Sequence, residues 1–235
     1  MRILGTICAR GGSKVVINKN IRLLNGKPLI SYSITALKAW GKANRIVCST
    51  DSKKIQNIAK ECGAEIPFTR PAELATDDAN KLDVLKHILN FCEEEENEKY
   101  DYIVDLDPTA PLRTVEDINT AFNKLLNSDA TLIYSVYKAD KNPYFNMVEL
   151  DENGYAHLSK MPGKTITSRQ KAPIVYSMNA SIYIYRRNFL IKTKSILNGK
   201  NIIYEMSDFS IDIDRQIDFG FIEFILKNGM FKFDY

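Results

Sequence analysis

The chain has 235 residues, of which 45% are apolar, so it is long enough for one large α/β domain, which we expect, or two small ones. Lysine and arginine number 32 against 29 aspartates and glutamates, which excludes the strong basic excess of typical nucleic-acid-binding proteins. No secretory signal opens the chain and no apolar run approaches the roughly 20 residues that span a bilayer, so we expect a cytoplasmic protein without a nucleic-acid or membrane partner.

The first part of the chain alternates apolar runs with amphipathic segments. Strands are predicted at residues 2–8 (RILGTIC), 45–50 (RIVCST), 64–70 (AEIPFTR), 100–110 (YDYIVDLDPTA) and 131–137 (TLIYSVY). Helices are predicted after Pro28, after Asp51, over residues 82–92 and over residues 115–128. This alternation indicates an α/β fold with a mostly parallel central sheet and helices on both faces.

The alternation breaks between residues 140 and 175. A hairpin is expected around residues 152–154, followed by a loop rich in proline, glycine and lysine, so we interpret 140–175 as an insertion in a single domain spanning 1–235. Strands are then predicted at 181–187, 201–206 and 209–214 (FSIDID). A final helix is marked by the apolar residues Ile217, Phe221, Phe224 and Ile225.

The loop after the first strand, ARGGSKVVINKN, has residues suited to phosphate but fits neither GxxxxGK[ST] nor GxGxxG. The adjacent glycines Gly11 and Gly12 would allow consecutive backbone N–H groups to face one anion. Arg10, Lys14 and Lys19 would add three positive charges for a triphosphate. The alternative is a tight turn with solvated lysines, and this loop alone does not decide between them.

The last predicted strand carries two aspartates. Asp212 and Asp214 would point the same way, with Ile211 and Ile213 pointing into the core. Two neighbouring carboxylates repel each other unless a cation lies between them, and Mg²⁺ commonly takes one or two carboxylates together with substrate phosphates. The alternative is that Asp214 only caps the final helix, which would leave Asp212 unexplained.

Other polar residues follow other predicted strands, where ligands bind in open parallel sheets. Ser49, Thr50 and Asp51 follow one strand, Arg70 another, and the segment DLDPTAPLR places Asp105 and Asp107 at a third. A helix-entry loop with acidic caps is the plainer interpretation of that last segment. The four cysteines lack metal-ligand spacing, so we expect free buried thiols, and His87 and His157 have no partner spacing for a triad or a metal site.

ARGGSK with KN, RPAEL, PTAPLR, RQKAP and DIDxxxDF occur in family order along almost the whole chain, which resembles the acylneuraminate cytidylyltransferases. This resemblance implies a Rossmann-like nucleotide-diphosphosugar transferase fold, Mg²⁺ as cofactor, CTP and a nine-carbon acidic sugar as substrates, and a homodimer formed through residues 140–175. The residues that it places at the nucleotide are Arg10, Gly11, Gly12, Ser13, Lys14, Lys19, Asn20, Arg70 and Asp107. It places Arg169, Gln170, Tyr176 and Asn179 at the sugar, and Asp212 and Asp214 at the magnesium ion.

The chain departs from the family pattern in two places. Val15 and Ile17 stand where the family usually has glycine and often proline, which concerns the second half of the loop. Asp107 replaces a glutamine of the sialic acid enzymes, and Asn80 and Lys81 replace small hydroxyl residues; both changes resemble the branch that activates N,N'-diacetyllegionaminic acid.

The resemblance implies a reaction in which the anomeric hydroxyl of the sugar attacks the α-phosphorus of CTP and pyrophosphate leaves. Arg10, Lys14 and Lys19 with Asp212 and Asp214 would then be catalytic, and Arg169 would bind the sugar carboxylate; the general base is not identified. The alternatives are a CMP-N-acetylneuraminate or CMP-pseudaminate synthetase, an enzyme of this fold acting on 3-deoxy-manno-octulosonate, and a non-catalytic nucleotide-binding protein.

Overall fold

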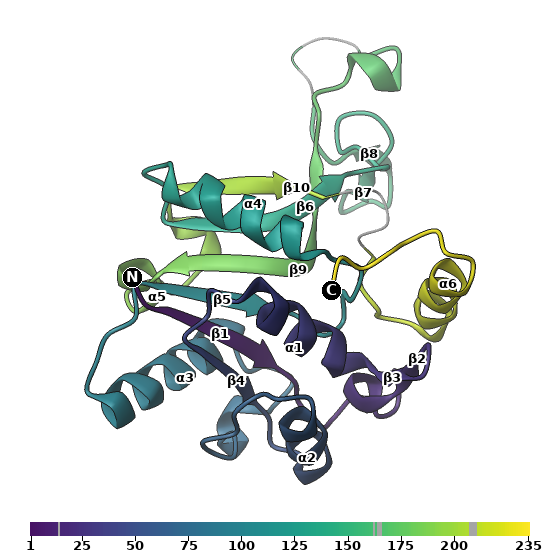
Figure 1. The fold of residues 1–235 in the computed structure, drawn as a ribbon. Coiled ribbons are helices and arrows are strands. Elements are labelled where there is room, and N and C mark those ends of the chain that lie inside the picture. The colour runs from purple at the N-terminus through teal and green to yellow at the C-terminus, as the bar shows by residue number, and fades with distance from the viewer. Residues whose placement is uncertain (14, 162, 164–165, 207–210) are drawn as a thin grey trace.

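The computed structural model describes residues 1–13, 15–161, 163, 166–206 and 211–235. A six-stranded sheet with the order β10-β6-β9-β5-β1-β4 forms its centre (Figure 1). Neighbouring strands are parallel except that β9 runs antiparallel to both β5 and β6, which confirms the mostly parallel sheet. Its strands are β1 Ile3–Cys8, β4 Arg45–Ser49, β5 Tyr102–Leu106, β6 Leu132–Lys138, β9 Tyr176–Arg186 and β10 Asn201–Glu205. Two hairpins lie outside it, β2 Leu23–Leu24 with β3 Lys27–Pro28 and β7 Val148–Leu150 with β8 Ala156–Leu158.

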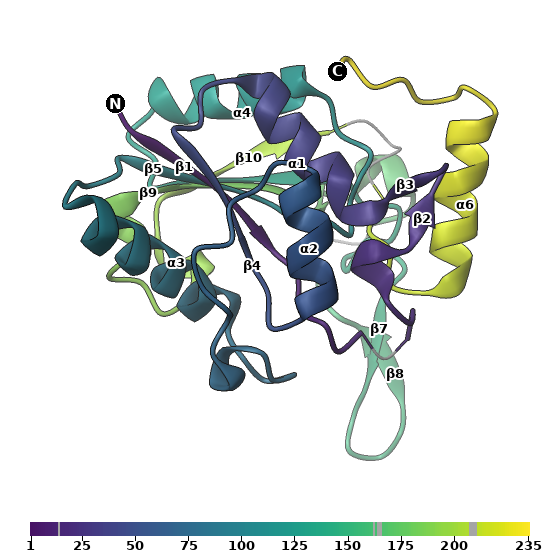
Figure 2. The same ribbon diagram turned by 60° about the horizontal axis from the view of Figure 1, so that its bottom comes forward.

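Helices cover both faces of this sheet, as the alternating pattern predicted. The α-helices are α1 Leu29–Trp40, α2 Lys53–Glu61, α3 Lys81–Glu96, α4 Val115–Leu126, α5 Arg187–Leu190 and α6 Gln216–Lys227, and short 3-10 helices span Lys19–Ile21, Ala72–Leu74, Arg169–Lys171 and Ile196–Asn198. Helices α1, α2 and α4 share one apolar core with the sheet, whereas α3 packs on the opposite face (Figure 2). Helix α6 packs separately against α1 around Leu29 and Tyr32.

Helix α3 is the element that carries a lysine to the carboxyl end of β5. Its first turn is capped by Asn80, whose side-chain oxygen accepts a hydrogen bond from the Leu82 N–H at 2.9 Å. Leu82, Leu85 and Leu89 are buried on its inner face. Because the helix is fixed at its start and along one side, Lys81 has a defined position next to the sheet.

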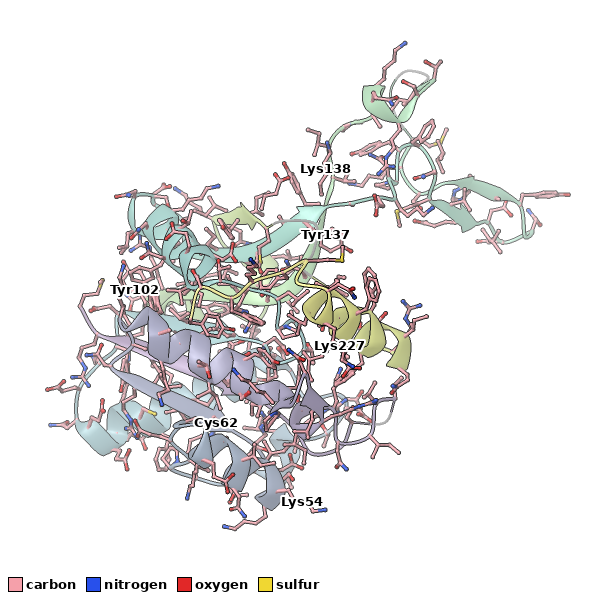
Figure 3. The ribbon with its side chains drawn as sticks, turned by 45° about the vertical axis from the view of Figure 1, so that its right-hand side comes forward. Lys54, Cys62, Tyr102, Tyr137, Lys138 and Lys227 are labelled. Atoms are coloured by element: carbon pink, nitrogen blue, oxygen red, sulfur yellow. The ribbon has the colours of Figure 1, made fainter. Side chains whose placement is uncertain are left out.

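Residues 139–175, here called the arm, leave the body of the molecule between β6 and β9. Figure 3 shows Tyr137 and Lys138 where β6 leaves the body, and the arm projects away from the helices beyond them. The predicted hairpin around residues 152–154 is confirmed as β7 and β8. Exposed apolar side chains are frequent along the arm: Met147, Val148, Leu150, Tyr155, Met161 and Ile174.

Two predicted strands are wrong within the described residues. Residues 64–70 form only one bridge, between Glu65 and Val47. Residues 209 and 210 lie outside the described residues, and residues 211–214 are irregular rather than extended in the sheet. The Ile213 N–H donates to the carbonyl of Thr109 at 2.8 Å, so this segment is fixed to the loop after β5 instead of to a neighbouring strand.

The final helix exists, but most of the apolar residues that marked it face outwards. Ile217, Phe221 and Phe224 are exposed, whereas Ile225 is buried. Phe219 and Ile222, two apolar residues not in that set, occupy the buried side together with Ile225. Apolar residues lie around most of this helix, so their spacing does not determine which side is buried.

Candidate active site

A cavity of about 510 Å³, here called the main cavity, opens where β1 and β5 end. Most of the residues predicted for the nucleotide contribute to its walls. The predicted residues that line it are Arg10, Ser13, Lys19, Asn20, Arg70, Asp107 and Asp214. Gly11, Gly12 and Asp212 belong to the same segments without lining the cavity, and Lys14 lies outside the described residues.

The glycine pair does not form a ready anion-binding nest in this structure. The Gly11 N–H donates to the Asp51 carboxylate at 2.8 Å, so that donor already has a negative partner. A Cβ at Gly11 would lie 2.9 Å from the Ser52 Cβ, whereas a Cβ at Gly12 would meet nothing within 4 Å. Close packing against the end of β4 therefore explains Gly11, while the chain itself does not require glycine at Gly12.

The cationic side chains of the loop are held by the protein. Arg10 forms an ion pair with Asp77, and Asn20 donates to the Arg10 carbonyl at 3.1 Å. Lys19 donates to the Ile213 carbonyl at 2.6 Å, and its Nζ lies 3.9 Å from the Asp214 carboxylate. Lys19 thus joins the opening loop to the segment that carries the two aspartates.

Arg70 is buried at the end of β4. Its guanidinium donates to the hydroxyl of Ser49 at 3.0 Å through Nε and to the Ser49 carbonyl at 2.6 Å through Nη2. Its Nη1 makes no hydrogen bond with any other described residue. Arg70 therefore fixes the strand end while leaving one donor group at the wall of the main cavity.

Asp212 and Asp214 have different environments. The Asp214 side chain is 78% exposed, whereas Asp212 is partly buried and its Oδ1 has no hydrogen-bond partner among the described residues. Burial, together with the nearby carboxylates of Asp107 and Asp214, raises the pKa of Asp212 to about 6 against the opposing effects of Thr109 and Lys19. The alternative prediction, that Asp214 only caps the final helix, is wrong. The carboxylate that accepts the backbone N–H groups before α6 is that of Asp218.

The two aspartates fit a divalent cation only if the substrate supplies more ligands. No group of three or more histidine, cysteine, aspartate or glutamate side chains suited to a metal occurs in the described ranges. However, the unpaired Oδ1 and the raised pKa of Asp212 indicate a carboxylate that a cation would stabilise. Mg²⁺ typically takes one or two carboxylates with phosphate oxygens and water, which fits this donor set.

Lys81, Asp105 and Asp107 form a charged group, here called the trio, beside the main cavity. The Lys81 Nζ lies 2.7 Å from Asp105 Oδ2 and donates to Asp107 Oδ2 at 2.8 Å. Asp107 Oδ1 accepts both the N–H and the hydroxyl of Thr109, at 3.1 and 2.8 Å. Burial favours the neutral amine, yet the two carboxylates raise the pKa of Lys81 well above its usual value. Burial alone would raise the pKa of Asp107, but Lys81 and the hydrogen bonds from Thr109 outweigh burial and lower it.

Arg113 is a site-forming residue that the sequence did not identify. It is fully buried, and it donates to Ser181 and Ser33 hydroxyls at 2.9 and 2.6 Å and to the carbonyls of Asp107 and Ala110. Burial lowers its pKa to about 10. Arg113 therefore fixes the loop between β5 and α4, on which Asp107 lies; only its place in PTAPLR could have indicated this.

The four residues predicted for the sugar lie apart from the main cavity. Arg169 and Gln170 lie on the arm, where Arg169 pairs with Asp140 at 3.1 Å, and Tyr176 is 39% exposed at the start of β9. Asn179 is buried, and its side-chain oxygen accepts from Ser135 at 2.6 Å. None of these four lines the main cavity, so one copy of the chain does not bring them to the nucleotide residues.

A second cavity of about 300 Å³, here called the side cavity, adjoins the main one at Lys81. Tyr183 and Tyr185 form one wall with their rings stacked at 6.2 Å, and Lys194 lies on another. Tyr185 is almost fully buried, whereas Tyr183 is partly exposed. The side cavity thus offers an aromatic surface, two hydroxyls and one cation.

The cysteines and the histidines belong to neither a catalytic group nor a metal site predicted from the sequence, although Cys8 lies at the wall of the main cavity. All four cysteines are free thiols, as predicted, but only Cys48 and Cys92 are fully buried, and burial raises their pKa values to about 12; Cys8 and Cys62 are partly exposed. His87 packs edge-on against Phe68, and His157 is exposed. Among the described residues, no helix has both the length and the apolar content needed to cross a membrane.

Comparisons with known proteins agree with this geometry. A family model described as cytidylyltransferase matches residues 4–228. Post-translational flagellin modification protein B of Campylobacter coli is 40% identical over 226 residues, covering 96% of this chain and 95% of that protein. CMP-N,N'-diacetyllegionaminic acid synthase of Campylobacter jejuni has the same identity and coverage. A solved CMP-2-keto-3-deoxy-manno-octonic acid synthetase complexed with CTP has a TM-score of 0.73 at 16% identity, covering 97% of this chain and all of that one, which confirms the fold.

Proposed function

This chain belongs to the cytidylyltransferase family, and we propose that it joins CTP to N,N'-diacetyllegionaminic acid, giving the CMP-sugar and pyrophosphate. The observation that carries this proposal is the gathering of Arg10, Lys19 and Arg70 in one cavity that meets a second, aromatic cavity at Lys81. The main cavity suits a nucleoside triphosphate, and the side cavity suits an acidic sugar. The 40% identity with the CMP-N,N'-diacetyllegionaminic acid synthase of Campylobacter jejuni supports the choice of sugar.

CTP would lie in the main cavity with its phosphates near Arg10 and Lys19. The anomeric oxygen of the sugar attacks the α-phosphorus, the bond from that phosphorus to the bridging oxygen breaks, and pyrophosphate leaves with the electron pair. Lys19 and Arg10 stabilise the negative charge that moves onto the leaving group. Mg²⁺ held by Asp212, Asp214 and the phosphates would neutralise further charge. The hydroxyl proton passes to a base that we leave unassigned.

The side cavity is the place for the sugar in this proposal. Because the reacting groups must meet, the sugar has to lie beside the nucleotide, and the side cavity adjoins the main one. The stacked rings of Tyr183 and Tyr185 suit the apolar face of a sugar ring, and their hydroxyls suit its polar groups. Lys194 offers one positive charge for the carboxylate.

Arg169 can contact the sugar only if a second copy of the chain is present. It lies on the arm and lines neither cavity, so we propose that the arm pairs two copies and brings Arg169 to the partner's sugar. The exposed apolar side chains of the arm, such as Leu150 and Tyr155, support pairing because a large exposed apolar surface is unfavourable in water. Light scattering of the protein and of a Leu150→Asp/Tyr155→Asp variant measures this: the variant should be a monomer with reduced turnover.

The experiment that tests the function is pyrophosphate release with CTP and Mg²⁺ against four sugars. These are N,N'-diacetyllegionaminic, pseudaminic, N-acetylneuraminic and 3-deoxy-manno-octulosonic acids. We expect turnover with the first to exceed the others by at least about tenfold, as a site built for particular polar groups does. Preference for another sugar would replace the substrate while keeping the reaction. CTP binding without turnover on any of the four would refute the proposal and favour a nucleotide-binding protein.

A further inference from the structure

Lys81, a member of the trio, is the only described residue that lines both cavities. We propose that Lys81 and Asp107 together recognise a hydroxyl group of the acidic sugar, and that Asp105 holds Lys81 in position for this contact. The inference rests on the proposed function, because it concerns the sugar of that reaction. It assigns a specificity-determining pair where the sequence offered only a departure from the family pattern.

The position of Lys81 supports a contact with substrate. Its side chain is 35% exposed although Asp105, directly behind it, is completely buried. The Lys81 Nζ lies 5.5 Å from the ring centre of Tyr183, which forms the wall of the side cavity. Lys81 therefore lies at the junction of the two cavities, whereas the cationic residues predicted to bind the nucleotide, Arg10, Lys19 and Arg70, line the main cavity and not the side cavity.

Counting donors and acceptors identifies the kind of group that would fit. Lys81 donates one ammonium hydrogen to Asp107 and also forms an ion pair with Asp105 at 2.7 Å, so at least one of its three hydrogens is left as a donor. Asp107 Oδ1 accepts twice from Thr109, whereas Oδ2 accepts only from Lys81, which leaves one acceptor place next to that donor. A hydroxyl both accepts and donates through one atom, so it satisfies the two places together.

The charge of the trio excludes the other groups that Lys81 alone would attract. One ammonium and two carboxylates carry a net charge of minus one, so a phosphate or a sugar carboxylate is repelled overall. A neutral hydroxyl avoids this repulsion and still gains hydrogen bonds to two charged partners. The sugar carboxylate must then lie away from the trio, towards another cation such as Lys194.

The trio is rigid enough to discriminate between sugars. The Thr6 hydroxyl donates to Asp105 Oδ1 at 2.8 Å and Thr109 donates twice to Asp107 Oδ1, so each carboxylate of the trio is held in place. Asp105 and Asp107 also belong to one strand end, which the buried Arg113 stabilises through the Asp107 carbonyl. A sugar lacking the hydroxyl would leave one donor of Lys81 and one acceptor place of Asp107 without a partner, which is the situation that gives strong rejection.

The test compares three variants by steady-state kinetics with both substrates. Asp107→Asn removes one charge with little change of shape. Lys81→Met/Asp105→Asn removes the ammonium together with the completely buried carboxylate, so the net charge of the trio stays at minus one and no unpaired charge remains at Asp105. Lys124→Met, on the exposed side of α4, is the matched control for loss of a lysine. Thermal unfolding confirms that each variant folds.

We expect the first two variants to raise the sugar KM by about 10- to 100-fold, the effect of one hydrogen bond to a charged group, with the CTP KM within about twofold. The control should match the wild type. Sugars lacking single hydroxyls then identify the group: one of them should lose affinity for the wild type yet be insensitive to the Lys81 substitution. A raised CTP KM with an unchanged sugar KM would assign the trio to the ribose and overturn the inference. Equal loss on all deoxygenated sugars would also overturn it, while absence of turnover by the wild type would refute the function itself.

Discussion

Arg113 offers the most direct test of how the loop after β5 is built. Arg113→Met removes hydrogen bonds to the hydroxyls of Ser33 and Ser181 and to the carbonyls of Asp107 and Ala110, all in the interior. Each hydrogen bond to a charged group contributes about 1.5–3 kcal/mol, and relief from burying the guanidinium, whose pKa burial lowers to about 10, offsets about 3 kcal/mol. The four hydrogen bonds less this offset give about 3–9 kcal/mol, and because single substitutions rarely cost more than about 5 kcal/mol we expect the free energy of unfolding to fall by about 3–5 kcal/mol.

For a chain of this length that loss corresponds to a decrease in melting temperature of about 8–15 °C, measured by calorimetry. Arg113→Lys retains a positive charge but has one donor group instead of a planar fork, so it should lose nearly as much stability. If the methionine variant melted within about 2 °C of the wild type, the reasoning would be refuted. A lysine variant as stable as the wild type would show that charge matters here and geometry does not.

Three further expectations concern the main cavity. Gly11→Ala should reduce both thermal stability and CTP affinity because its Cβ would lie 2.9 Å from the Ser52 Cβ, whereas Gly12→Ala should melt like the wild type; scanning fluorimetry with and without CTP separates them, and equal effects would contradict the packing argument. Lys19→Met should raise the CTP KM by about tenfold or more, since the proposed charged contact with the phosphates is lost, together with the hydrogen bond to the Ile213 carbonyl; an unchanged KM would remove Lys19 from the nucleotide site. In metal-free protein the Asp212 pKa of about 6 lies above its unfolded value of about 3.9, so the folded state binds the proton more tightly and stability falls as the pH rises from about 4 to about 6. Asp212→Asn should remove this pH-dependent loss of unfolding free energy, which is on the order of 1–3 kcal/mol. Urea unfolding at pH 5 and pH 7.5 in EDTA checks this, and a variant with the same pH dependence as the wild type would be the contrary result.

The sequence predicted the sheet and the place of the site because both depend on local pattern. Strands that alternate with helices require a covered, mostly parallel sheet, and such a sheet collects the residues that follow its strands. This is how Arg10, Arg70 and Asp107 were expected in one place, and they line one cavity. The sugar residues followed from resemblance alone, and Arg169 lies on the arm, whose position no local pattern specifies.

The interactions within the site were not predictable, because they join segments far apart in the chain. Lys81 meets Asp105 only because a cap at Asn80 starts α3 beside the end of β5. In the sequence, Lys81 reads as the first residue of an amphipathic helix, where a solvated lysine is the ordinary interpretation. The same limit applies to Arg113, whose acceptors come from α1, from β9 and from its own loop.

The segment around Asp212 shows why a wrong element can still place residues correctly. The prediction of a strand over residues 209–214 gave alternating directions for the aspartates and isoleucines, and the described part is irregular. Ile213 is nevertheless fully buried, because it packs with Phe219 and Ile222 of α6 and its N–H donates to Thr109. Alternation could not predict that Asp212 is partly buried while Asp214 stays in solvent, so the cost of ionisation, and hence the gain from a bound cation, is concentrated on Asp212.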